Sequence, residues 1–240
     1  MQEKELKTSK GQRVAIAIIA FFMLGSIIAF YAAIIVGNSK SSSSDTGLSE
    51  ERITYYQNKY SEQVSKFKEV SASDFAKFSP YLSEIKAYNE TNANSGGVQT
   101  RDLLTGTGRT LEDKDGNYLA YYVGWCADEK VFDSSLDSDK NPTAFAKALD
   151  VSVGMIEGWY QGAKGMKLGG IRELTIPGEL AYGDKMEICG GYNKPLKFLV
   201  MAVAAEDPLK TAAANLDAAY MGLQYANAGI DYEKNVQSSN

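Results

Sequence analysis

The chain has 240 residues, of which 44% are hydrophobic and 23% charged, and its net charge is −5 at pH 7. This length suits one ordinary domain with attachments, and the acidic balance argues against a nucleic-acid partner, because phosphate binding needs a basic patch. The absence of histidine excludes imidazole-based triads and dyads and His-ligated metals, and two cysteines are too few for a thiolate zinc site. We therefore expect no metal and no other cofactor.

Residues 14–36 form an uncharged apolar segment near the N-terminus. A helix of this length spans roughly 30 Å of hydrocarbon, which predicts a transmembrane helix in contact with the lipid bilayer. The alternative is a cleaved signal peptide, whose apolar region is shorter, about 7–15 residues. Basic residues precede the segment at Lys4, Lys7, Lys10 and Arg13. By the positive-inside rule, residues 1–13 form a cytoplasmic tail, and the chain is a single-pass cell-membrane protein whose main domain lies outside the cytoplasm.

Residues 37–47 are rich in serine and predict a flexible linker, followed by a helical segment over 48–92. Its first helix carries an apolar stripe at three- and four-residue steps: Ile53, Tyr56, Tyr60, Val64 and Phe67. The stripe either packs against its own domain or the C-terminal helix, forms a homodimer, or contacts client proteins. A second short helix is predicted from Ser79-Pro80, and residues 89–97 predict a loop at the border of the main domain.

Strand-like runs alternate with turns from residue 98 to 204. Asp115-Gly116 indicates a hairpin turn before a strand over 118–123, and residues 196–203 indicate a buried strand. The helical pattern inside this region is short, over 155–163. Asp207-Pro208 then begins a C-terminal helix, and the whole terminal segment, 207–240, ends in a polar tail.

Several short motifs follow one another in this region: Tyr122-Val-Gly, Phe132-Asp-Ser-Ser, Met155-Ile-Glu-Gly-Trp159 and Leu180-Ala-Tyr-Gly, with Phe198 after them. Their order and spacing resemble the FKBP-type peptidyl-prolyl cis/trans isomerases. The resemblance implies an α+β fold over residues 97–206, with an antiparallel sheet wrapped round a short helix. It also implies an enzyme that isomerises X-Pro bonds in proline-containing unfolded or exported proteins. This reaction needs no proton shuttle, only a site that binds the twisted amide better than the planar one.

The resemblance also implies roles for individual residues. Three are expected to act in catalysis: Phe132 as an aromatic wall, Asp133 beside the substrate carbonyl, and Tyr182 through its hydroxyl. The residues expected to bind substrate are Tyr122, Phe145, Met155, Ile156, Trp159 and Phe198, with Ile156 acting through its backbone N–H and Trp159 as the pocket floor. The plainer interpretation is that these aromatics are core residues. We expect Ser134 and Ser135 to serve the turn rather than the chemistry.

The loop Asp184–Lys194 departs from the family pattern, because it lacks the proline pair and any histidine. A basic partner for Asp133 is also missing near Ser138, so Asp133 either pairs with Lys140 or stays partly solvated. These departures leave open a non-catalytic chaperone or an assembly module of a membrane complex. Cys126 and Cys189 form either a disulfide, which persists outside the cytoplasm, or two free thiols.

Overall fold

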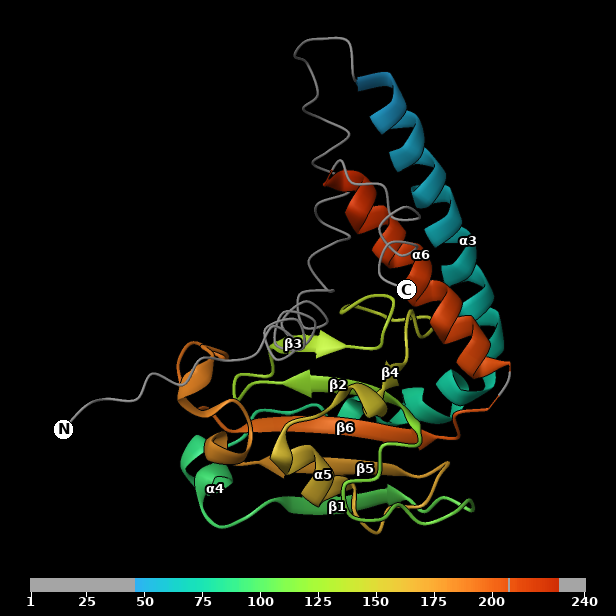
Figure 1. Ribbon diagram of the computed structural model, residues 1–240. Coiled ribbons are helices and arrows are strands. Elements are labelled where there is room, and N and C mark those ends of the chain that lie inside the picture. The colour runs from blue at the N-terminus through green and yellow to red at the C-terminus, as the bar shows by residue number, and fades with distance from the viewer. Residues whose placement is uncertain (1–45, 207, 229–240) are drawn as a thin grey trace, which may run out of the picture. The chain divides into compact units, whose positions relative to one another are not determined.

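The computed structural model describes residues 46–206 and 208–228 (Figure 1). Within them, six strands form one antiparallel sheet in the order β1-β5-β6-β2-β3, with β4 paired to β2. The strands are β1 (Gln99–Leu104), β2 (Leu119–Trp125), β3 (Val131–Ser134), β4 (Leu149–Asp150), β5 (Ile171–Ile176) and β6 (Leu196–Val203). The helices are α3 (Thr46–Phe78), α4 (Glu90–Asn94), α5 (Glu157–Ala163) and α6 (Leu209–Asn227). Short 3₁₀ turns are η2 (Ser79–Glu84), η3 (Val151–Val153), η4 (Gly178–Leu180) and η5 (Gly183–Lys185). The expected antiparallel sheet around one short helix is confirmed.

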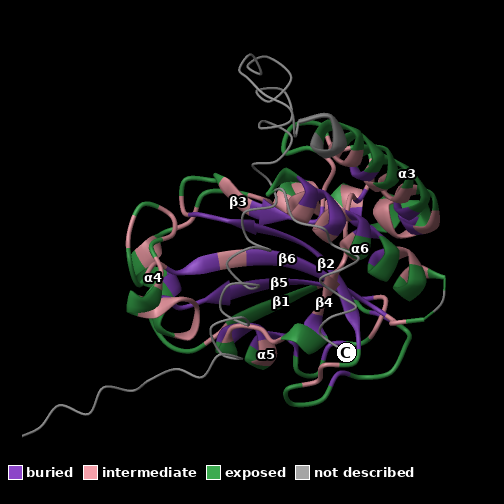
Figure 2. Cartoon of the chain, turned by 45° about the horizontal axis from the view of Figure 1, so that its top comes forward, coloured by how far each residue is buried: buried purple, intermediate pink, exposed green. Residues whose placement is uncertain are grey.

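Both faces of the sheet are covered, which explains why every residue of β2 is buried. Successive side chains of a strand point to opposite faces. Ala120 and Tyr122 therefore join the core under α5, whereas Leu119, Tyr121 and Val123 join a second core under α3 and α6. Figure 2 shows the buried strands between α5 on one side and α3 with α6 on the other. We call these the α5 core and the α3/α6 core.

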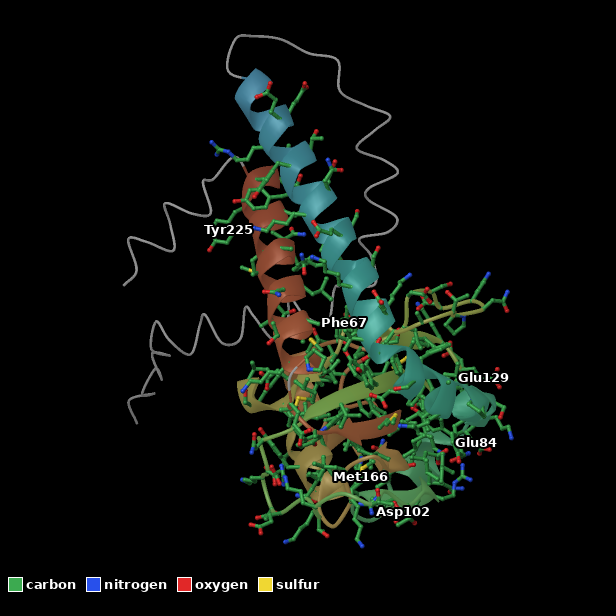
Figure 3. All side chains as sticks on the ribbon, turned by 90° about the vertical axis from the view of Figure 1, so that its right-hand side faces the viewer. Phe67, Glu84, Asp102, Glu129, Met166 and Tyr225 are labelled. Atoms are coloured by element: carbon green, nitrogen blue, oxygen red, sulfur yellow. A yellow bond between two sulfur atoms is a disulfide. The ribbon has the colours of Figure 1, made fainter. Side chains whose placement is uncertain are left out.

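Helices α3 and α6 run side by side in both Figure 1 and Figure 3. The rings of Tyr60 and Tyr220 lie 5.9 Å apart, and Tyr56 is buried against Leu223. Further along α3, Phe67 reaches the sheet (Figure 3). The apolar stripe of α3 thus packs against the C-terminal helix and its own domain, which confirms that interpretation.

Three local expectations were wrong. Helix α3 begins at Thr46, inside the expected linker. The expected loop 89–97 contains α4, because the Asn89 side chain accepts the N–H of Asn92 and caps a helix. Asp115-Gly116 does not close a hairpin, since the preceding strand β1 pairs with β5. The Asp115 carboxylate instead accepts backbone N–H groups within its own loop.

Several expectations lie outside the described residues: the tail 1–13, the transmembrane helix 14–36, most of the linker, the cap at Asp207 and the tail from 229 on. Of the helices in the described ranges, none combines the length and the apolar character needed to cross a bilayer.

Candidate functional site

Four aromatic rings meet in the α5 core: Tyr122 from β2, Phe132 from β3, Trp159 from α5 and Phe198 from β6. Ring centroids lie 5.6 Å apart for Phe132 and Phe198, 5.4 Å for Trp159 and Phe198, and 5.9 Å for Tyr122 and Trp159. All three pairs meet edge to face, a geometry worth about 0.5–1.5 kcal/mol per pair beyond burial. We call these rings the aromatic cluster. The structure brings them together as the sequence predicted.

Gly124 makes the contact between Phe132 and Phe198 possible. It lies opposite Phe198 on β6 and opposite Asp133 on β3. A Cβ atom at this position would stand 2.6 Å from the Phe132 ring and 2.8 Å from the Phe198 ring, both inside contact distance. The absence of a side chain therefore lets the two rings close over the strand.

Trp159 is the innermost ring, with no exposed surface. Its indole N–H donates to the Tyr118 hydroxyl at 3.0 Å, so the buried polar atom is satisfied. Gly158 lets α5 approach β5, because a Cβ atom there would lie 2.2 Å from Ile176. Glycine at position 158 therefore helps place the tryptophan beneath the other rings.

Met155, Ile156 and Tyr182 are partly buried and pack against the α5 core, which contains the aromatic cluster. We call these three residues the rim of the cluster. Ile156 is the N-cap residue of α5, and Tyr182 lies just before η5. Within the described part of the chain, neither the Ile156 N–H nor the Tyr182 hydroxyl has a hydrogen-bond partner. Both donors remain available for the carbonyl oxygens of a peptide.

Asp133 is only 2% exposed and is held on several sides. Its carboxylate accepts the Tyr122 hydroxyl, the Ser134 N–H at 2.8 Å and the Lys147 ammonium at 3.1 Å. Burial raises the pKa of Asp133, while Lys147 and Tyr122 oppose that shift. Both expectations for this residue were wrong: its cation is Lys147, and it is not solvated. Lys140 is exposed and forms a turn with Ser138 instead.

Of the two serines after Asp133, Ser134 serves the turn as expected, since its hydroxyl accepts the N–H of Leu136. Ser135 does not: its hydroxyl accepts the N–H of Tyr122 and so links the segment to β2.

Phe145 does not belong to the site. Its ring stacks on Tyr121, with centroids 3.8 Å apart, and meets Phe75 and Phe78 edge to face. It therefore lies fully buried in the α3/α6 core, on the other side of the sheet from Trp159. The predicted contact with substrate is wrong, because rings from α3 and β2 surround Phe145.

Cys126 and Cys189 form a disulfide, with Cα atoms 5.5 Å apart and a sequence separation of 63. The alternative of two free thiols is wrong. The bond ties the loop Asp184–Lys194 to the end of β2.

A hollow of about 230 Å³ lies beside the disulfide. It is lined by Cys126, Asp128, Lys130, Phe132, Cys189 and Gly190. The hollow borders the aromatic cluster through Phe132.

The sequence motifs missed two residues of the site, Tyr118 and Lys147. Tyr118 precedes β2 by one residue, and strand alternation could have placed it on the same face as Tyr122. Lys147 carries no such signal. It reaches Asp133 because the N–H of Ala146 bonds to the Ser135 carbonyl at 2.8 Å and folds residues 136–147 back onto β3.

Comparison with known proteins gives the family. The FKBP-type peptidyl-prolyl cis-trans isomerase model matches residues 111–202. An FK506-binding protein of Neisseria meningitidis serogroup B is 40% identical over 109 residues, which cover 45% of this chain and 93% of the relative. The chain belongs to the FKBP-type peptidyl-prolyl cis-trans isomerase family. It is thus an isomerase of this type by family.

Two further relatives extend beyond the FKBP-type domain. The peptidyl-prolyl cis-trans isomerase Mip of Chlamydia trachomatis is 33% identical over 156 residues, covering 62% of this chain and 60% of the relative. The crystal structure of FkpA from Escherichia coli is 24% identical and covers 82% of each chain, with a TM-score of 0.36.

Proposed function

We propose that this FKBP-type isomerase binds a twisted X-Pro amide over the aromatic cluster and assists the folding of exported proteins at the outer face of the membrane. The observation that carries the first half is the arrangement of two unpaired donors, the Ile156 N–H and the Tyr182 hydroxyl, at the rim of the cluster.

The chemistry follows from the amide itself. Planar X-Pro amides are charge-separated by resonance, and rotation about the C–N bond removes that resonance at a barrier of about 18–20 kcal/mol. An apolar aromatic surface solvates the twisted amide at less cost than the planar one. Donors that hold the carbonyl oxygens fix the peptide while the bond turns. The rate gain comes from binding the twisted state more tightly, so no nucleophile or cofactor is needed.

The location rests on separate support. The apolar segment 14–36 is long enough to anchor the chain, and the basic residues before it favour a cytoplasmic N-terminus. The Cys126–Cys189 disulfide fits an oxidising compartment, since cytosolic thiols are normally kept reduced. X-Pro isomerisation takes tens to hundreds of seconds, which is slow enough to limit the rate of folding.

The test combines activity with topology. The purified full-length chain should accelerate the proline-limited refolding of a secreted protein, and Tyr182→Phe should lower that rate while leaving the fold intact. Protease should be added to cells from which everything outside the cytoplasmic membrane has been removed while that membrane stays intact. It should digest residues 48–240 and spare residues 1–13. An inactive wild-type protein would overturn the catalytic half, and full protection of residues 48–240 would overturn the location.

A second candidate function is a chaperone that holds clients without isomerising them. It is favoured by two exposed aromatics outside the aromatic cluster, Tyr192 in the loop Asp184–Lys194 and Tyr55 on α3, which are 57% and 54% exposed. Exposed aromatic side chains suit contact with unfolded segments. Suppression of client aggregation that survives Tyr182→Phe but is lost in a Tyr55→Ser/Tyr192→Ser double variant would favour this function.

A further inference from the structure

Asp133 presents an electrostatic problem that the site must solve. A carboxyl group with 2% exposure loses its hydration, and burial favours the neutral form. A protonated Asp133 would carry an O–H donor and would accept the Tyr122 hydroxyl and the Ser134 N–H less strongly than the carboxylate does, because the bonds would no longer be charge-assisted. The geometry of the cluster therefore depends on what keeps this group ionised.

Lys147 lies where it can supply that charge. Its Nζ atom is 3.1 Å from Oδ1 of Asp133. The Lys147 side chain is 26% exposed and that of Asp133 only 3%, so water reaches the pair from the lysine side. The same Nζ atom is 5.9 Å from the centre of the Tyr122 ring. One ammonium group thus faces both the carboxylate and the tyrosine that the carboxylate orients.

Hydrogen bonds hold the backbone of the segment that carries Lys147. The N–H of Ala146 bonds to the Ser135 carbonyl at 2.8 Å, while the Ser135 N–H bonds to the Tyr122 carbonyl at 2.8 Å. The lysine therefore emerges from a segment that is tied, through Ser135, to the same strand that carries Tyr122. This makes the ion pair part of the site and not a chance surface contact, which would be worth little.

We propose that Lys147 is a positioning residue of the isomerase site, which keeps Asp133 as a carboxylate and thereby holds the Tyr122 ring against Trp159. The inference rests on the proposed function of the aromatic cluster. Lys147 acts through Asp133 and Tyr122 and does not itself touch the substrate.

The groups that face this pair come from four elements. Tyr122 on β2 and Tyr182 beside η5 face Asp133, whereas Asp217 of α6 lies near both Lys147 and Asp150 of β4. In the described structure, the cation bonded to Asp133 is Lys147. Its removal should therefore let burial raise the pKa of Asp133 further, and the acid limb of activity should move to higher pH.

The test uses the full-length chain and five variants. Lys147→Met keeps the length of the stem and removes the charge, while Lys147→Arg restores a cation. Lys68→Met is the matched control, because Lys68 forms a 3.0 Å ion pair with Asp137 in the same segment but does not contact the cluster. We expect Lys147→Met to lower kcat/KM at pH 7 about five- to tenfold. Lys147→Arg and Lys68→Met should stay within about twofold of the wild type.

The last two variants, Asp133→Asn and Asp133→Asn/Lys147→Met, test whether the lysine acts through the carboxylate. A neutral amide needs no cation, so Lys147→Met should change kcat/KM less than about twofold in the Asp133→Asn background. An equal loss in both backgrounds would overturn the proposal, as would an equal loss in Lys68→Met.

A second readout does not depend on activity. The ¹³C shift of the Asp133 carboxyl carbon, followed against pH in the folded protein, should show protonation at higher pH in Lys147→Met than in the wild type, and no such change in Lys68→Met. Unchanged titration in Lys147→Met would overturn the proposal even if the enzyme were inactive. A wild-type protein without activity but with the expected titration shift would overturn the proposed function and leave the Lys147–Asp133 pairing standing.

Discussion

Trp159 and Tyr118 are joined by a hydrogen bond of 3.0 Å from the indole N–H to the phenol oxygen, and both side chains are buried. The bond links α5 to the residue before β2, 41 positions earlier in the chain. The deepest ring of the aromatic cluster therefore belongs to the core that holds helix and sheet together.

Replacing Trp159 should accordingly cost stability as well as activity. We expect Trp159→Ala to lower the free energy of unfolding by about 3–5 kcal/mol, because it leaves a large cavity under α5. Tyr118→Phe should cost about 1–3 kcal/mol, since it leaves the indole N–H buried without an acceptor. Urea unfolding measures both. An unchanged midpoint in Trp159→Ala would contradict the placement of this ring at the bottom of the cluster.

The disulfide should stabilise the fold by closing a long loop. In the chain-entropy treatment, a bond between residues 63 apart is worth about 4 kcal/mol. We expect the Cys126→Ser/Cys189→Ser variant to unfold at lower denaturant concentration than the oxidised protein, and at the same concentration as the reduced wild type. If the oxidised and reduced wild types unfold together, the bond does not constrain the chain.

Gly222 of α6 tests the packing of the two long helices. A Cβ atom there would meet the Tyr56 ring at 2.3 Å, so Gly222→Ala should push α6 away from α3 and cost about 1–3 kcal/mol. On an unpartnered helix face the same change would stabilise the helix by about 1 kcal/mol through propensity. The sign of the change in thermal unfolding therefore decides whether the stripe of α3 packs on α6 in solution.

Asp217 of α6 should make stability depend on pH. Burial first, and Asp150 second, raise its pKa to about 6, while Lys147 opposes the shift. The folded protein thus binds this proton more tightly than the unfolded chain. Stability from this group is full below the ordinary pKa of 3.8 and is lost as the pH rises through about 6.

Replacement by asparagine removes this dependence. Between pH 4 and pH 7, the wild type should lose on the order of 2 kcal/mol relative to Asp217→Asn, a figure reduced from the full shift because the side chain is partly exposed. The control is Asp139→Asn, which alters an exposed carboxylate in a surface turn. Parallel stability curves for the wild type and Asp217→Asn would show that the environment of Asp217 does not penalise its charge.

The strands and the aromatic cluster could be predicted from the sequence because their sequence signals are local. Residues 196–203 are apolar except for Lys197 and include β-branched and aromatic members, and β6 has these bounds. Tyr122, Phe132, Trp159 and Phe198 each lie in a short motif of fixed spacing. A motif of that kind sets which strand or helix carries the ring and which face it occupies.

The predictions for Phe145 and for the partner of Asp133, which is Lys147, were wrong because these contacts are not local. Both residues follow a long loop, and a shift of one residue in such a loop sends a side chain to the other face of the sheet. Phe145 packs against Tyr121 and the rings of α3, and no local sequence pattern near residue 145 indicates these contacts. The partner of Asp133 depended on the same fold-back, so the sequence suggested Lys140 where the structure has Lys147.

The most direct test of the account compares the two faces of the sheet. The wild type, Phe132→Ala and Phe145→Leu should be assayed on a short X-Pro peptide, with kcat/KM normalised to the folded fraction of each protein. We expect the wild type to be active, Phe132→Ala to lose tenfold or more (about 1.4 kcal/mol of transition-state binding), and Phe145→Leu to keep its activity. An equal loss in both variants, or a wild type no faster than buffer, would contradict catalysis at the aromatic cluster.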